Sequence, residues 1–217
     1  TTEIYTLSLH DALPIYVRSV SLVGLVVLTA ACTSTNVSRS DVDTNPDPTS
    51  AIIALNADGT IPDQNYSGAG INKTYTTFSN GFGFGYAYGS VRGTDDFLGV
   101  AGFRTGIGVG DALTTTGSVS YNAAYDFTRT RGNTEIERAG NLTLIADFTT
   151  ASATVTGADN GLVVNGTFDG TDLDGSVTFD GVTATLDGAI GEDRVVGAFA
   201  GHDQDGVLVG GFAGNAN

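Results

Sequence analysis

The chain has 217 residues, a formal net charge of −15, 31 glycines, 4 prolines and a single cysteine. The acidity argues against a nucleic-acid partner, because phosphate binding requires clustered Lys and Arg side chains. The single cysteine excludes an internal disulfide, and the glycines lack the three-residue period of collagen.

The first 15 residues read TTEIYTLSLHDALPI. They match one reading frame of a common short-read sequencing adapter, and they contain neither Met nor a run of basic residues. We therefore expect residues 1–15 to be an adapter scar in place of the native start, and we exclude them from fold reasoning.

The segment from Val20 to Ala31 reads VSLVGLVVLTAA and carries no charge. It is too short to span a bilayer as a helix, but it suits the apolar region of a signal peptide. Its last small residues stand directly before Cys32, an order that resembles the bacterial lipobox. The resemblance implies a truncated signal peptide over residues 16–31, cleavage before Cys32 and lipidation of its thiol. The alternative is a buried core segment with an unmodified cysteine.

Residues 32–50 are polar, interrupted by proline and without periodicity, so we expect a disordered tether. Thr33 follows the cysteine where Asp would favour retention in the inner membrane. An outer-membrane lipoprotein, at the cell surface or on the periplasmic face, is therefore the expected location.

Residues 51–113 predict a handle-like region of short strands and loops, with apolar runs at 52–55 and 95–103. Between these runs, NGFGFGYAYGSV places four rings on one face of a strand and small residues on the other. The rings belong to Phe82, Phe84, Tyr86 and Tyr88. They are candidate partner-binding residues; the alternative, which the pattern favours, is packing against the wall of a neighbouring barrel.

From residue 114 onward, apolar and polar residues alternate with period two in eight short segments separated by Gly, Asp and Asn turns. Eight consecutive antiparallel strands close into an up-and-down barrel, which removes exposed edges. We therefore predict an all-β fold with a barrel over residues 114–217. The large inward side chains should fill its interior, which leaves binding to the loops and the aromatic segment. They are Tyr121, Tyr125, Phe127, Leu142, Leu144, Phe148, Leu162, Phe168, Phe179 and Leu186.

Two segments resemble the barrel domain of the transferrin-binding-protein-B-like surface lipoproteins. TTTGSVSYNA (114–123) is similar to the opening strand of that domain, and VVGAFAGHDQDGVLVGGFAGN (195–215) is similar to its closing hairpin. The matching hairpin residues are Gly197, Phe199, Gly201, Gly210, Gly211 and Phe212. The resemblance implies a lipid-anchored binding protein with one barrel, whose loops contact a protein or solute partner.

No motif for catalysis or for a cofactor is present. His202 is the one histidine outside the adapter segment, and its sequence context, GHDQDG, indicates a turn. Asp169, Asp172 and Asp174 could supply oxygen ligands for Ca²⁺, but they lack the spacing of an EF-hand loop and are typical of hairpin turns. We therefore expect neither an enzyme nor a metal site.

The alternative function is that of a small integral outer-membrane barrel. Such a protein needs strands of about 9–11 residues with an apolar outer face. The presumed outer faces here carry Thr, Asp and Asn, which favours the lipid-anchored binding protein.

Overall fold

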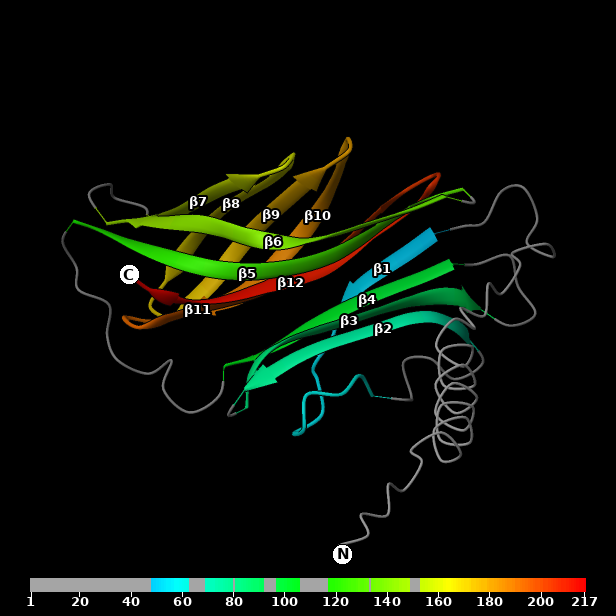
Figure 1. Ribbon diagram of the computed structural model, residues 1–217, viewed down its shortest axis with the longest axis horizontal. Helices are drawn as coiled ribbons and strands as arrows, with labels where there is room; N and C mark the ends of the chain where they lie inside the picture. Colours follow the sequence, from blue (N-terminus) through cyan, green and yellow to red (C-terminus); the bar gives the residue numbers. More distant parts are fainter. Residues whose placement is uncertain are drawn as a thin grey trace, which may run out of the picture. The chain divides into compact units, whose positions relative to one another are not determined.

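The computed structural model describes residues 48–62, 69–79, 81–91, 97–105, 117–132, 134–148 and 153–217 (Figure 1). Every regular element in these ranges is a β-strand. No helix in the described part of the chain is long and apolar enough to cross a membrane. The predicted adapter scar, signal peptide and lipidation site at Cys32 lie outside the described residues, as does the tether up to residue 47.

Eight antiparallel strands form a closed barrel, in the order β10-β11-β12-β5-β6-β7-β8-β9. This confirms the predicted all-β fold and its eight-stranded barrel. The strands are β5 (Ser118–Arg131), β6 (Thr134–Asp147), β7 (Thr154–Asp159), β8 (Leu162–Asp169), β9 (Asp172–Phe179), β10 (Val182–Ile190), β11 (Arg194–Asp203) and β12 (Gly206–Ala216).

Two hairpins of the barrel turn through Asn-Gly and Asp-Gly pairs. Asn160 and Gly161 join β7 to β8, while Asp180 and Gly181 join β9 to β10, and all four have positive φ angles between 46° and 88°. Positive φ at both central residues is typical of the type I′ turn, whose twist matches that of the flanking strands. These turns fix the strand register, and so they fix which side chains face inward.

The interior of the barrel is filled by its own side chains, as predicted. Phe127 lies at the centre, with its ring centroid 4.6 Å from that of Phe179 and 6.2 Å from that of Phe199. Phe148 and Phe168 pack edge to face at 4.9 Å and are partly buried against this cluster. The other large buried members are Tyr121, Tyr125, Leu142, Leu144, Leu162, Leu173, Leu186, Leu208 and Phe212.

Glycines of the closing hairpin allow close packing of neighbouring strands and rings. Gly197 lies opposite Phe212 in the β11–β12 pair, whereas Gly210 lies against the backbone of β5 at Asp126 and Phe127. A Cβ at Gly197 would come within 2.6 Å of the Phe212 ring, which real side chains do not tolerate. The Gly/Phe pattern that carries the family resemblance is therefore a packing pattern.

The β5–β6 hairpin is longer than the sequence indicated. Both strands have 14 residues, whereas apolar alternation in β6 begins only near Asn141. The first half of β6 is mostly exposed, and β6 pairs with β7 over Ile145–Asp147 alone. With one exposed edge and few apolar residues, this half carries no period-two signal for sequence reasoning to find.

A four-stranded sheet precedes the barrel, in the order β1-β4-β3-β2. Its strands are β1 (Pro48–Ile52), β2 (Ala69–Ser79), β3 (Phe82–Val91) and β4 (Phe97–Thr105). β1 pairs in parallel with β4. It begins at Pro48, inside the segment predicted to be tether, and β2 was not predicted.

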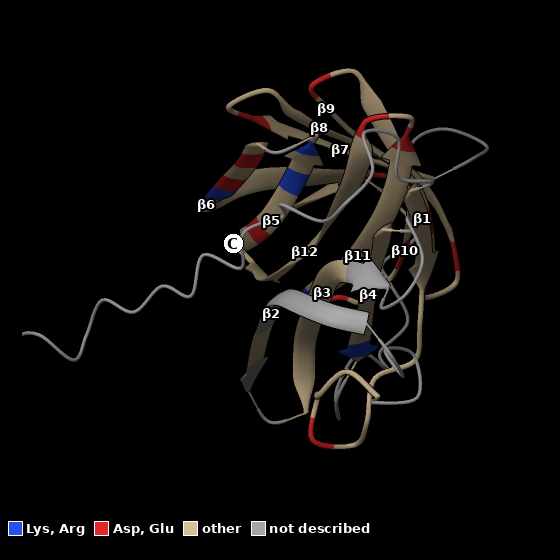
Figure 2. Cartoon of the chain, turned by 90° about the vertical axis from the view of Figure 1, so that its right-hand side faces the viewer, with Lys and Arg blue, Asp and Glu red and all other residues tan. Residues whose placement is uncertain are grey.

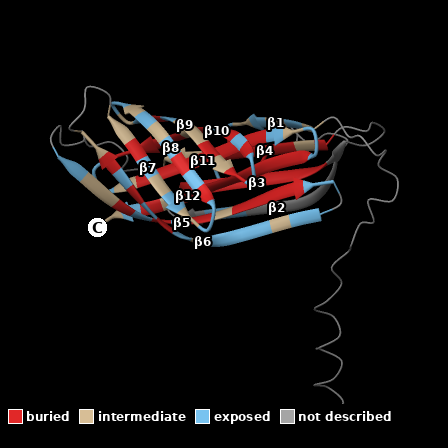
Figure 3. Cartoon of the chain, turned by 90° about the horizontal axis from the view of Figure 1, so that it is seen from above, coloured by how far each residue is buried: buried red, intermediate tan, exposed pale blue. Residues whose placement is uncertain are grey.

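One face of this sheet packs on the outer wall of the barrel at β11 and β12. Phe84, Tyr86 and Tyr88 of the sheet form one buried cluster with Ala198 and Val209 of the barrel. A Cβ at Gly211 would overlap the Phe84 ring. Figure 3 shows that β3, β4, β11 and β12 consist largely of buried residues, whereas the first half of β6 is exposed.

Candidate functional site

The aromatic stripe of β3 lies between the sheet and the barrel. Phe82 is 9% exposed, and Phe84, Tyr86 and Tyr88 are at most 1% exposed. Of the two interpretations offered for these rings, packing against the barrel wall is the one that the structure shows. Contact between the rings and a partner would require the sheet to lift off the barrel.

Two tyrosines of the stripe carry their hydroxyl groups to carboxylates on the outer face of the β5–β6 hairpin. Tyr86 donates to Asp126 and also lies 3.2 Å from the Thr128 hydroxyl, while Tyr88 donates to Glu135. Burial, followed by these carboxylates, raises the pKa of both tyrosines well above its usual value. The seam between sheet and barrel is therefore apolar at its centre and hydrogen-bonded at its margin.

Two tyrosines inside the barrel also donate hydrogen bonds through their hydroxyl groups. Tyr121 donates to the Gly191 carbonyl at 2.8 Å, and Tyr125 donates to Asp159 at 2.5 Å. Burial is the main cause that raises the pKa of both, to about 12 for Tyr121. The four buried tyrosines are thus neutral hydrogen-bond donors at physiological pH.

Alkaline pH is expected to destabilise the fold through these four tyrosines. A raised pKa in the folded state means that their contribution is complete below about pH 10 and is lost as the pH rises above the value for an unfolded chain. In a titration of tyrosinate absorbance, Tyr86, Tyr88, Tyr121 and Tyr125 should ionise only after the fold is lost. The same chain in guanidinium chloride is the control; coincident native and denatured curves would contradict the assignment.

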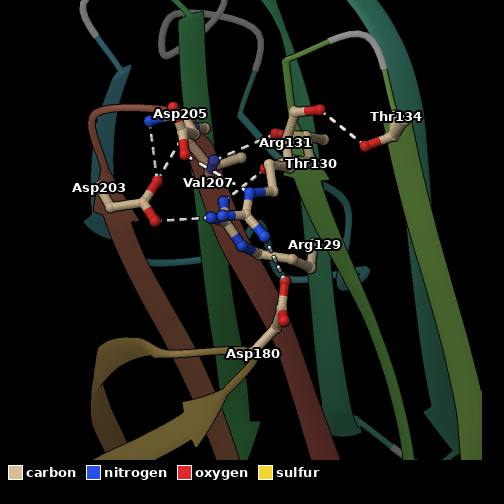
Figure 4. Close-up of polar contacts among 9 residues, drawn as sticks. Arg129, Thr130, Arg131, Thr134, Asp180, Asp203, Asp205 and Val207 are labelled. Carbon is tan, nitrogen blue, oxygen red and sulfur yellow. Dashed lines mark hydrogen bonds and ion pairs between the residues drawn. The ribbon is translucent and has the colours of Figure 1, made fainter.

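One end of the barrel is closed by a buried arginine (Figure 4). Arg129 points to the same face of β5 as Phe127, and its side chain is 1% exposed. Its Nη2 lies 2.6 Å from Asp203 Oδ2, and its Nη1 donates to the Thr130 carbonyl. Its Nε has no hydrogen-bond partner among the described residues. A buried cation of this kind needs its anionic partner.

Asp203 both pairs with Arg129 and shapes the β11–β12 turn. Its Oδ1 accepts hydrogen bonds from the N–H groups of Asp205 and Gly206, at 2.9 and 3.0 Å. Burial alone would raise the pKa of this carboxyl, but the Asp205 N–H and the Arg129 charge outweigh it, and the pKa is lowered. Asp203 is therefore ionised wherever the protein is folded near neutral pH.

The turns at this end carry exposed charges of both signs. Arg131 lies 3.4 Å from Asp205 and 3.8 Å from Asp180, in ion pairs that join three hairpins (Figure 4). Figure 2 shows Asp and Glu residues on several barrel turns and fewer Lys and Arg residues. Exposed pairs of this kind contribute little to stability, but they leave a polar, largely acidic rim.

An open groove of about 480 Å³ lies on the outer side of the barrel beside β1. Its floor is the outward face of β9, β10 and β11, and its wall is β1. Ser50 Oγ of the wall lies 2.8 Å from Nδ1 of His202 on the floor. The remaining lining residues are Ala51, Ile52, Asp174, Thr183, Thr185, Leu186, Asp187, Ala200 and Gly201.

Two carboxylates face each other across strands in this groove. Asp187 of β10 lies directly opposite Asp174 of β9. Burial, and then the charges of Asp174 and Asp172, raise the pKa of Asp187. Like charges directly opposite one another destabilise a strand pair, so the groove holds an uncompensated negative charge.

The structure separates the three aspartates weighed as calcium ligands. Asp169 and Asp172 flank the β8–β9 turn, whereas Asp174 lines the groove. No three His, Cys, Asp or Glu side chains in the described part of the chain are grouped so as to hold a metal ion. His202, predicted to be a turn residue, is instead the penultimate residue of β11 and exposed to the groove.

Similar proteins are found among solved structures. No family model matches the sequence, and no curated protein matches it. Among solved structures, the chain is similar to the haemoglobin receptor HpuA from Kingella denitrificans, with 12% identity and a TM-score of 0.42. It is also similar to transferrin-binding protein B from Neisseria meningitidis, with 12% identity and a TM-score of 0.44. A mutant of the transferrin-binding protein B of Haemophilus parasuis is similar with 14% identity and a TM-score of 0.45.

These solved structures include transferrin-binding proteins, the class that the closing hairpin resembles. The matches cover 62%, 66% and 69% of this chain. The chain spans only 54% of the haemoglobin receptor and 35% and 37% of the two transferrin-binding proteins.

Proposed function

We propose that this chain is a lipid-anchored bacterial outer-membrane protein that binds a protein or solute partner through its outer surface and loops. The observation that carries the proposal is the packed barrel. Its centre is occupied by rings in mutual contact, whereas barrels that hold a small ligand keep an open interior. Binding then falls to the outside of the protein.

The polar side chains on the outer face of the barrel favour contact with water rather than with lipid. Residues of β8 and β10 that point outward include Asn165, Thr167, Thr183 and Thr185, all exposed. An integral outer-membrane barrel needs an apolar band about 25 Å tall at these positions. The sheet also covers the outer face of β11 and β12, which a lipid-embedded barrel would leave to the bilayer.

The charge of this chain's own surface, rather than the ligands of the similar solved structures, indicates the kind of partner. The rim of turns and the groove beside β1 are acidic, as is the chain as a whole, with a net charge of −15. Such a field favours association with a partner of positive charge and slows association with an acidic one.

The anchor is tested by replacing Cys32 with serine. The chain is expressed in a Gram-negative host with Met and basic residues placed ahead of Val17. The unchanged chain should incorporate labelled palmitate and sediment with membranes, because its thiol receives the lipid. Cys32→Ser should lose the label and leave the membrane fraction, whereas Thr33→Ala, the matched control, should behave as the unchanged chain.

Two results would bear on the proposal in different ways. Membrane association of Cys32→Ser in the absence of detergent would contradict the lipid anchor and favour the integral barrel. Digestion of the unchanged chain by protease added to intact cells would place it at the cell surface, and resistance would place it on the periplasmic face.

A further inference from the structure

Among the described strands, β1 lies at the edge of its sheet, and some of its backbone groups have no partner in the described part of the chain. It is the last strand of its sheet and pairs on one side, with β4. The N–H of Ile53 donates to the Ala101 carbonyl of β4 at 2.8 Å. Because successive residues of a strand point their backbone groups to opposite sides, the N–H and C=O of Ser50 and Ile52 face away from β4.

The residues that carry these groups, Ser50 and Ile52, line the groove. Ser50, Ala51 and Ile52 form its wall, and its volume of about 480 Å³ lies in the range of binding pockets. The five residues of β1 correspond to a length of about 17 Å in an extended strand. Pro48 lacks an N–H and limits the ladder at that end.

The groove favours a cation. Asp174 and Asp187 oppose each other on its floor, and none of the described residues that line it is Lys or Arg. The Ser50 and Thr185 hydroxyl groups and the His202 imidazole lie in the same groove and can accept hydrogen bonds from an ammonium or guanidinium group. A ligand that brings positive charge between the two carboxylates relieves their repulsion.

We propose that this groove binds an extended peptide segment with Lys or Arg side chains, which adds to β1 as a further strand of the sheet. The proposal deepens the binding function proposed above and rests on it. Backbone hydrogen bonds to Ser50 and Ile52 hold the segment in register. Alternate side chains of the segment point to the floor, where basic ones reach Asp174 and Asp187.

The experiment measures fluorescence anisotropy of labelled decapeptides with the full mature lipoprotein in detergent, at low ionic strength. The probe consists of five Lys-Val repeats, and it should bind. A decapeptide of five Glu-Val repeats should not bind. A Lys-Val decapeptide with alternate backbone nitrogens methylated keeps its charge but cannot form the ladder, and it should bind at least about tenfold more weakly.

Matched variants separate the backbone from the charge. Ser50→Pro removes the outward N–H without removing a bond to β4, whereas Ser50→Ala removes only the hydroxyl. Ser50→Pro should weaken binding of the Lys-Val probe at least about fivefold more than Ser50→Ala does. The double variant Asp174→Asn and Asp187→Asn should weaken it by about tenfold at low salt and remove most of its salt dependence.

A folding control comes from the same carboxylates. Since the ionised form of Asp187 is disfavoured in the folded protein, Asp187→Asn should raise the Tm near pH 7 and have little effect at about pH 3, where the carboxyl is protonated. Weaker probe binding by a more stable variant cannot be ascribed to unfolding.

Three results would overturn the proposal: no binding of the Lys-Val probe, equal binding of the Glu-Val probe, or equal binding of the methylated probe. Displacement of the probe by a peptide copied from residues 33–47 would indicate that this segment of the chain itself occupies the groove. That result would contradict binding of a segment from another protein. None of these results changes the outcome expected for Cys32→Ser, so failure of the groove and failure of the anchored binding protein are distinguishable.

Discussion

Phe212→Ala is expected to lower the free energy of unfolding by about 3–5 kcal/mol. Phe212 is fully buried in the barrel, and its ring lies over Gly197 in the facing strand. Because Gly197 has no side chain to move into the vacated space, the cavity should remain largely open. Urea denaturation measures the loss directly, and thermal denaturation should show a drop in Tm on the order of 10 °C.

Ile145→Ala is the matched control in the same barrel. Ile145 is 48% exposed on the outer face of β6, so its truncation removes little buried area and should cost less than about 1 kcal/mol. Equal losses for Phe212→Ala and Ile145→Ala would mean that the Phe212 ring does not lie in the packed centre.

The barrel could be predicted from the sequence because its signals are local. Alternation in 141–147 assigns Leu142, Leu144 and Ala146 to one face without reference to any other strand. The Asn160-Gly161 and Asp180-Gly181 pairs mark hairpins by their own backbone preferences. Closure then follows, since eight sequential antiparallel strands have few other ways to cover their edges.

The sheet and the groove could not be predicted in the same way, because they depend on contacts between distant parts of the chain. The alternation of β3 showed that its four rings share a face, but not that β11 and β12 cover them. Ser50 and His202 are 152 positions apart, and the groove exists only once β1 lies beside the barrel. β1 itself lies in a proline-rich polar segment, where composition predicted a tether.

Arg129 shows the same limit at a single residue. Its position in the alternation of β5 places it on the inward face. In the sequence, an arginine at such a position indicates that the strand has already ended. Its partner Asp203 is 74 positions away. Asp203 belongs to a turn motif whose hydrogen bonds are local, so the motif by itself indicates no distant partner. Sequence spacing alone gives no reason to join the two.

Asp203→Asn is expected to lower the free energy of unfolding more than Arg129→Met does. The Asn side chain still accepts the turn hydrogen bonds from Asp205 and Gly206, but it leaves the buried Arg129 guanidinium without an anion. Leaving a buried charge unpaired costs about 1–3 kcal/mol, and the lower half of that range applies because the Asp203 side chain is 40% exposed. Arg129→Met keeps the buried volume and removes the charge together with its unpartnered Nε, so we expect a cost of less than about 1 kcal/mol.

The double variant and the pH dependence test whether the pair acts as a unit. In the Arg129→Met background, Asp203→Asn should lower the free energy of unfolding by little more. This non-additivity of the two changes measures the coupling between Arg129 and Asp203. The pKa of Asp203 is lowered in the folded protein, so its contribution is present above about pH 4, the usual value for Asp, and is lost as the pH falls further. That loss should be smaller in Arg129→Met, although not absent, because the Asp205 N–H also lowers this pKa. Additive single losses and an unchanged acid limb in Arg129→Met would show that Asp203 stabilises the turn alone and that the arginine closes the barrel by packing.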